Sequence, residues 1–214
     1  MQPKQDNYDV AREKARLYFL NRMEHRPPCL KSVETQGGCY RFPFLGAMTR
    51  VDSGTGEVTF SWPWGPDWEA DYSEALSVYD WLCDRKPDAT SSGEFCPVGS
   101  LPGVYVGGGG LSMSGGSFSE KIDKAPDRFR AACVSLGGAE LPLGDLGFRL
   151  NVFPDLPMVL KFYHGDEDFP PSLTLLWDKN TLRFVRYETV YYIAGCLLDR
   201  LSLRMEMIPR NGTL

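Results

Sequence analysis

The hydrophobic period of the chain changes along its length, and each change predicts a different kind of element. Residues 8–23 repeat at helical spacing, whereas from Gly38 onward apolar and polar residues alternate, as in a half-buried strand. Alternating runs surround the glycine-rich turn at 52–56, so residues 38–62 are predicted to form an antiparallel β-meander. Pro43 has no amide hydrogen, and we therefore expect a free edge or a bulge there.

Helical spacing marks further segments in the first two thirds of the chain. Residues 72–83 and 117–136 repeat with a helical period, the second run being broken at Pro126. Asp67 is the candidate cap of the helix at 72–83, because its side chain can accept an orphan backbone amide. The first helix should carry its stripe on Tyr8, Ala11, Ala15 and Tyr18, and the second part of 117–136 should turn inward Phe129, Ala132, Cys133 and Leu136.

The last third predicts a second meander and a long final helix. Strands are expected at 146–153, 156–163 and 173–177. In the helix that follows, Arg200 and Arg204 are expected opposite an apolar face made of Val190, Ile193, Ala194, Leu197, Leu198 and Leu201.

Runs of strands separated by helices, without β-α-β alternation, favour the α+β class. We expect two antiparallel β-meanders packed with about four helices in one compact domain over residues 1–214. Its expected parts are an N-terminal helix and linker (1–37), the first meander and helix (38–84), a loop rich in Gly, Ser and Pro (85–116), helices with the second meander and the C-terminal helix (117–204), and a tail (205–214).

Composition and charge narrow the function classes. A content of 43% hydrophobic and 13% aromatic residues can fill a core. The net charge of −5, with no block of Lys or Arg, argues against nucleic acid and against an anionic membrane surface as partners. No apolar run of 18 residues or more occurs, and the first residues are polar, so we expect a cytoplasmic protein without a signal peptide or membrane span.

The densest group of chemically active side chains is the acidic turn, His164 to Pro171. Asp166 and Asp168 are two residues apart, so in an extended chain their carboxylates point to one side and could hold a divalent cation. One of them could instead act as general base beside His164, and Glu167 adds to the binding surface. The alternative is a solvated hairpin turn.

Two loops are further candidates. Gly107 to Gly116, with Gly108 and Gly109 at its centre, precedes a helix and could present amides to an anion, but it has neither phosphate-binding glycine pattern. A lid or a plain linker is the alternative. The loop with Trp62, Trp64 and Trp68 could form an aromatic ligand wall or an interface, or it could simply close the core.

Nucleophilic and metal chemistry have weak support. The six cysteines, at 29, 39, 83, 96, 133 and 196, include no C-x-x-C pair, so free buried thiols are expected. Cys96 and Ser112 are possible nucleophiles, and His164 is the one plausible base, because His25 is expected to complement a helix end. The residues do not identify a cofactor, and its identity is left unknown.

Short motifs along the chain carry a family resemblance. They are Phe153-Pro-x-x-Pro, Gly165-Asp-Glu-Asp-Phe-Pro170 and Leu-Leu-Trp-Asp178, preceded by Phe44-Leu-Gly46, Tyr79-Asp-Trp-Leu82 and Leu-Pro-Gly103. On these residues the chain resembles an uncharacterised family of anaerobic bacteria and archaea, known as a domain of unknown function. Some relatives are fused to a four-cysteine iron–sulfur domain similar to that of the corrinoid methyl carrier of anaerobic one-carbon metabolism.

The resemblance implies an accessory or binding domain near anaerobic cofactor chemistry, and it carries over no catalytic residue. This chain lacks the cysteine cluster of the fused relatives. We expect a cytoplasmic accessory or binding protein that recognises a partner protein or a cofactor-like small molecule through the Gly-rich loop, the acidic turn and the Trp62–Trp68 loop. The alternative is an enzyme that uses a metal on Asp166 and Asp168, or His164 as general acid–base.

Overall fold

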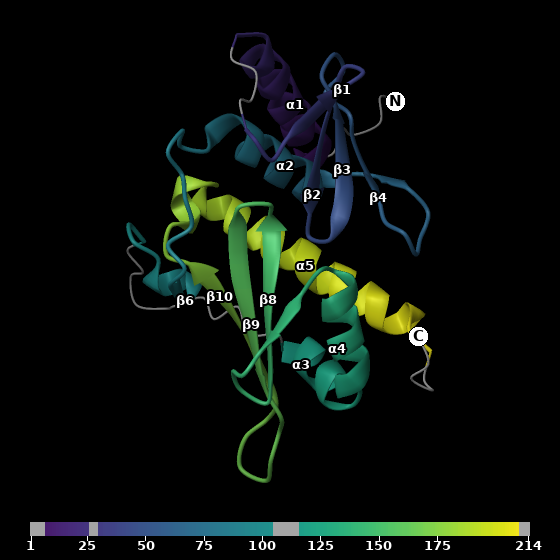
Figure 1. The fold of residues 1–214 in the computed structure, drawn as a ribbon, viewed down its shortest axis with the longest axis vertical. Coiled ribbons are helices and arrows are strands. Elements are labelled where there is room, and N and C mark those ends of the chain that lie inside the picture. The colour runs from purple at the N-terminus through teal and green to yellow at the C-terminus, as the bar shows by residue number, and fades with distance from the viewer. Residues whose placement is uncertain (1–6, 26–29, 105–115, 210–214) are drawn as a thin grey trace.

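Two antiparallel sheets of five strands each, with five helices beside them, make up the described part of the chain (Figure 1). The computed structural model describes residues 7–25, 30–104 and 116–209. The predicted α+β class is confirmed, with one helix more than expected. Of the helices in these ranges, none combines the length and the apolar character needed to cross a bilayer.

The first sheet is a meander in which each strand pairs with the next one along the chain. Its strands are β1 (Glu34–Gln36), β2 (Cys39–Phe44), β3 (Ala47–Asp52), β4 (Val58–Ser61) and β5 (Trp68–Glu69). β1 pairs with β2 only as far as Arg41, so at Pro43 β2 has β3 as its one neighbour. Pro43 thus lies at a free edge of β2, where a residue without an amide hydrogen is tolerated.

The second sheet follows the same plan and adds one strand from the preceding loop. Its order is β6-β10-β9-β8-β7, made of β6 (Phe95–Cys96), β7 (Ala139–Leu141), β8 (Leu146–Phe153), β9 (Leu156–Tyr163) and β10 (Ser172–Asp178). The strands predicted at 146–153 and 156–163 have the observed bounds. β6 was not expected, because a two-residue strand leaves no periodic signal.

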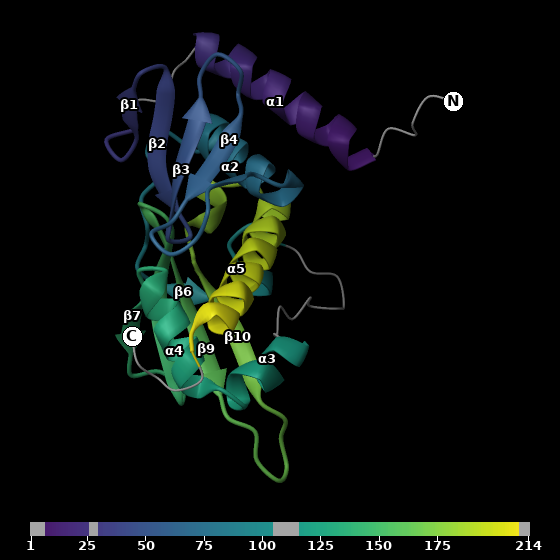
Figure 2. The same cartoon turned by 90° about the vertical axis from the view of Figure 1, so that its right-hand side faces the viewer.

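The helices pack against each other and along the sheets. They are α1 (Asn7–His25), α2 (Tyr72–Asp84), α3 (Gly116–Asp123), α4 (Pro126–Ser135) and α5 (Tyr187–Met207), with 3-10 turns at Val98–Ser100 and Thr181–Arg183. α5 crosses the molecule where the two sheets meet and contacts α2 and α4, as the two perpendicular views show (Figures 1 and 2). All four residues predicted to turn inward are buried, three of them on α4 and the fourth, Leu136, at its C-cap.

Two local predictions are wrong. α1 buries Phe19 and Met23, whereas Tyr8 and Tyr18 are 63% and 46% exposed. Tyr18 stays at the surface because its hydroxyl donates to the carboxylate of Asp84 at 2.8 Å. The cap of α2 is Asp71 in place of Asp67, because the chain forms β5 first and turns into the helix only after residue 70.

The turn Leu45-Gly46 connects the two sheets. Both residues have positive φ, 47° and 77°, which is the geometry of a two-residue hairpin turn between twisted strands. The Leu45 amide donates to the Val152 carbonyl of β8 at 2.9 Å, and the Leu45 side chain is buried. Gly46 lies directly against the backbone of Leu136, and this close approach leaves no room for a side chain.

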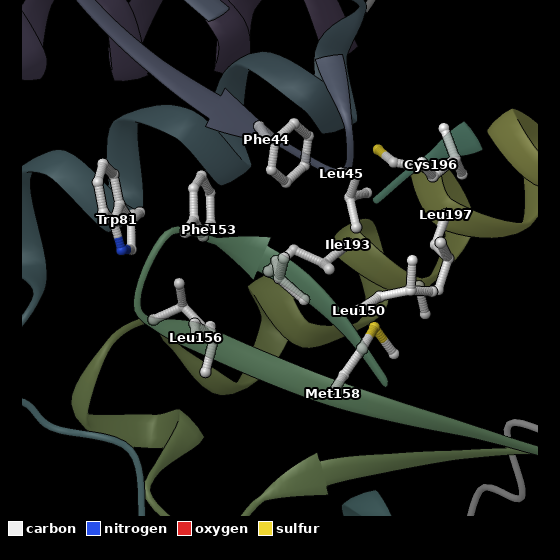
Figure 3. Close-up of a cluster of buried hydrophobic side chains, with 14 of the residues drawn as sticks. Phe44, Leu45, Trp81, Leu150, Phe153, Leu156, Met158, Ile193, Cys196 and Leu197 are labelled. Carbon is white, nitrogen blue, oxygen red and sulfur yellow. The ribbon is translucent and has the colours of Figure 1, made fainter. Parts of the chain in front are cut away.

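Aromatic rings continue this connection into one core. Phe44 stacks on Phe153 with ring centroids 4.8 Å apart, and Phe153 lies nearly parallel to Trp81 at 4.6 Å. The three rings stand in a row in Figure 3, with Ile193 and Leu197 of α5 beside them. The buried residues of both sheets therefore belong to one hydrophobic cluster.

Gly46→Ala should destabilise the protein more than Gly38→Ala. The two glycines occupy the same position of two-residue turns, with φ of 77° and 73°, so alanine brings a backbone penalty of about 1–2 kcal/mol at either site. At position 46 the new Cβ would also lie 2.6 Å from Leu136 Cα, whereas at 38 its nearest neighbour is Ser53 Oγ at 3.8 Å. Urea unfolding should give an additional loss of about 1–3 kcal/mol for Gly46→Ala. Equal losses would show that the contact with Leu136 does not constrain the turn.

Candidate functional site

A largely apolar cavity of about 470 Å³ opens between the loop after β4, the start of α2 and the C-terminal half of α5. Its volume lies in the range of small-molecule binding sites, about 300–1,000 Å³. We call it the tryptophan pocket. It is lined by Trp62, Gly65, Pro66, Trp68, Glu69, Asp71, Glu74, Asp199, Arg200, Leu203 and Met207.

A buried ion pair forms the base of the tryptophan pocket. Arg200 on α5 is only 4% exposed, and its Nη2 donates to Glu74 Oε1 on α2 at 2.7 Å. Its Nη1 donates to the backbone carbonyls of Phe44 and Leu45 in the β2–β3 turn. Burial lowers the pKa of Arg200, while Glu74 opposes that shift. The guanidinium thus joins α5, α2 and the first sheet at one point.

Four aromatic rings surround the Arg200 guanidinium. Its central carbon lies 4.7 to 5.9 Å from the ring centroids of Phe44, Phe60, Trp62 and Trp68. A cation at this distance from a ring face is attracted by the quadrupole of the ring, and the attraction grows when water is excluded. The aromatic cage therefore offsets part of the cost of burying the charge.

The tryptophans are fixed by contacts with their neighbours. Trp68 donates its Nε1–H to Glu74 Oε2 at 3.1 Å, and Trp62 lies against it with ring centroids 4.5 Å apart. Trp64 stacks on Trp62 with ring centroids 3.6 Å apart, and the Arg204 guanidinium lies over the Trp64 ring. Gly65 is required here, since a Cβ would fall 2.4 Å from the Trp62 indole nitrogen. Of the predicted site residues, Trp68 lines the pocket and Trp64 backs its wall.

The rim combines carboxylates with an apolar ledge. Glu69, Asp71 and Asp199 are exposed, and Asp71 also caps α2 by accepting from the Glu74 amide. On the α5 side, Leu203 and Met207 are nearly half exposed. The pocket is therefore apolar inside and acidic at its mouth.

The prediction that Arg200 lies on the polar side of the final helix is wrong, because its side chain is buried. Charged residues at a helical period are by default expected on the solvated face. The spacing did hold a signal, because residues 193, 197, 200 and 204 follow each other at intervals of 4, 3 and 4 and so lie on one stripe. Its buried partner lies 126 residues away and could not be inferred from one sequence.

The acidic turn lies elsewhere in the molecule. It forms the tip of the β9–β10 hairpin, at the opposite end of the long axis from the first sheet in both views (Figures 1 and 2). Asp166 Oδ1 accepts from the amides of Asp168 and Phe169, so this carboxylate closes the turn. His164 Nδ1 lies 2.7 Å from Asp123 Oδ1, and its amide donates to Asp145.

Two of the three segments expected to form one binding surface, the acidic turn and the Trp62–Trp68 loop, lie apart. The acidic turn with Glu167 and Asp168 is remote from the Trp62–Trp68 loop, and Gly108, Gly109 and Ser112 lie outside the described residues. Within the described ranges, no group of three or more His, Cys, Asp or Glu side chains is placed to hold a metal ion.

The cysteines were expected to be free buried thiols, and this is confirmed for the five that the structure describes. Cys29 lies outside the described ranges. Burial raises the pKa of Cys83 to about 12 and also raises that of Cys96. A thiol with a raised pKa is protonated at neutral pH and is a poor nucleophile. His25 ends α1, where its Nδ1 lies 2.8 Å from the Asn21 carbonyl oxygen.

A second, more polar cavity of about 420 Å³ lies between α1, α2 and α5. At its edge Asp80 of α2 caps α5, because its Oδ2 accepts from the Arg186 amide at 2.7 Å and from the Thr189 hydroxyl at 2.5 Å. Burial raises the pKa of Asp80, although these two hydrogen bonds oppose the shift. We interpret this carboxylate as a helix cap.

Fold and pocket together define an α+β domain of two linked meanders with a preformed aromatic cavity. The family model described as "Domain of unknown function (DUF3786)" matches residues 30–200, and the chain therefore belongs to that family. No curated protein and no solved structure matches the chain.

Arg200→Met should reduce the free energy of unfolding by about 3–5 kcal/mol, because Glu74 is left as a buried and unpaired charge. The double variant Glu74→Gln/Arg200→Met should recover part of that loss. Lys179→Met, which breaks an exposed pair with Glu94, is the matched control and should cost about 0–1 kcal/mol. Urea unfolding followed by circular dichroism measures all three. A double variant as unstable as the single one would mean that Arg200 acts through packing alone.

Asp80→Asn should gain stability relative to the unmodified protein as the pH rises. The pKa of Asp80 is raised in the folded state, so its contribution to stability is complete below the unfolded pKa, about 4, and is lost as the pH rises through the folded pKa. Asparagine does not titrate but keeps an acceptor oxygen for Arg186 and Thr189. Urea unfolding from about pH 4 to about pH 7 tests this, with the exposed Asp88→Asn as control. If the difference in unfolding free energy between Asp80→Asn and the unmodified protein does not change with pH, the raised pKa is contradicted.

Proposed function

We propose that this protein is a non-catalytic binding protein that holds a small organic molecule in the tryptophan pocket. The observation that carries the proposal is the pocket itself: an apolar cavity whose inner carboxylate, Glu74, already has its partners in the chain. Glu74 is paired with Arg200 and with the Trp68 indole, so the interior is set before a ligand arrives. Such preorganisation lowers the ordering cost of binding.

The residues around the pocket favour binding over chemistry. Its lining, taken over the described residues, has no His, Cys, Ser or Lys that could act as base or nucleophile. Glu74 is committed to Arg200, and Asp71 is committed to the cap of α2. A nucleophile next to a general base, the pattern of covalent catalysis, is not assembled among these side chains.

The size of the pocket favours a small molecule as ligand over a partner protein, which is the other kind of ligand that the sequence leaves open. A cavity of about 470 Å³ lies in the size range of sites for drug-sized molecules, whereas protein interfaces are mostly flatter and bury about 800 Å² on each side. A role in anaerobic corrinoid or iron–sulfur metabolism rests on the family resemblance and stays a prediction, as does a cytoplasmic location. The enzyme alternative also stays a prediction, with Asp166 closing its own turn.

The neutral fluorescent probe N-phenyl-1-naphthylamine should bind saturably with one site per chain. Leu203→Gln should weaken that binding roughly three- to tenfold, because it removes part of the apolar wall. Leu17→Gln is the matched control: Leu17 also lies on a helix and is 52% exposed against 46% for Leu203, but it does not line the pocket. Absence of saturable binding, or equal effects of the two substitutions, would contradict the proposal.

A further inference from the structure

We infer that the tryptophan pocket takes an aromatic amine, with the ring inside and the cationic nitrogen at the mouth. The inference rests on the proposed function and names the chemical class of its ligand. It follows from the way charge is distributed between the base of the pocket and its rim.

The lining carries far more negative than positive charge. Four carboxylates, Glu69, Asp71, Glu74 and Asp199, stand against the single guanidinium of Arg200, a net charge of −3. Glu74 neutralises Arg200 in the buried pair, so the three exposed carboxylates face an incoming ligand without a cation from the lining. Arg204, one turn further along α5, lies over the Trp64 ring and donates to Ser135 Oγ, and it is not among the lining residues.

The base of the pocket carries no net charge, because Glu74 neutralises Arg200. The guanidinium is already enclosed by the rings of Phe44, Phe60, Trp62 and Trp68, so a ligand meets an apolar surface at this end. A ligand cation would find no free carboxylate here, since Glu74 is held by Arg200 and by the Trp68 indole. The neutral apolar base and the acidic rim therefore favour one orientation, with the ring inward and the amine outward.

An anionic ligand meets the reverse situation. Its charge would pass three carboxylates at the mouth and reach a guanidinium that Glu74 and two backbone carbonyls already engage. A neutral ligand of the same shape gains the apolar contacts alone. The order of affinity should therefore be amine, then alcohol, then carboxylate.

The test uses three molecules with the same ring and chain: 4-phenylbutylamine, 4-phenylbutanol and 4-phenylbutyrate. Each is titrated against the naphthylamine probe bound to the 214-residue chain, at low salt and again at high salt. At low salt the amine should displace the probe about five- to tenfold more tightly than the alcohol, as expected for an exposed charge near several carboxylates. The preference should shrink at high salt.

Two double variants separate the rim from the overall charge of the protein. Glu69→Gln/Asp199→Asn should bring the amine and the alcohol to within about twofold of each other, because the amine loses the attraction of the rim. Asp88→Asn/Glu94→Gln removes the same charge from exposed residues outside the pocket and should leave the preference intact. Asp71 is kept in both, because it caps α2.

The outcomes distinguish the inference from the proposed function. The alcohol or the carboxylate could bind as tightly as the amine while Leu203→Gln still weakens probe binding. In that case the proposed binding function holds and the inferred preference for amines is wrong. If the control pair abolishes the preference as well, the rim is not its source and the inference is overturned. If none of the three molecules displaces the probe, and Leu203→Gln behaves like Leu17→Gln, the proposed function itself fails.

Discussion

The structure depends on the burial of one guanidinium. Arg200 can be enclosed only if its charge and its donors are satisfied, since an unpaired buried charge costs several kcal/mol. Its partners come from three places: Glu74 on α2, the backbone carbonyls of the β2–β3 turn, and a cage of aromatic rings from the first sheet. Meeting that requirement brings α5, α2 and the first sheet together, and the space left beside them is the tryptophan pocket. Stability and the candidate site thus have a common origin.

The fold was largely predictable because its elements carry strong local periods. The alternation at 146–153 and 156–163 gave the observed bounds of β8 and β9, and helical spacing gave the three buried residues of α4 and its buried C-cap, Leu136. The site was less predictable. The tryptophan loop stood out by composition, whereas Arg200 was placed on the solvated face because a lone charge on a helix is exposed by default. Its burial depends on Glu74 and on the Phe44 and Leu45 carbonyls, which are remote in sequence and join it only in the folded chain.

The motifs that carry the family resemblance mostly hold the structure together. Trp81 and Phe153 stack between the sheets, and Asp80 caps α5. Asp178, at the end of β10, is fully buried and accepts from Ser92, Gly93 and Asn180, which fastens the loop before β6 to the second sheet. The lining of the tryptophan pocket lies outside these motifs. Such residues can mark membership of a family through its architecture without indicating what each member binds, which fits a domain of unknown function.

The double attachment of Arg200 also bears on how the molecule responds to heat. The side chain that forms the base of the pocket is the one that holds the turn between the sheets, so the cavity is not a separate flap that can open while the rest stays folded. Its opening belongs to the same cooperative unit as the separation of the two meanders. A molecule that occupies the cavity therefore raises the melting temperature of the entire domain. Its binding can then be detected by the thermal unfolding of the second sheet as well as by a signal from the pocket.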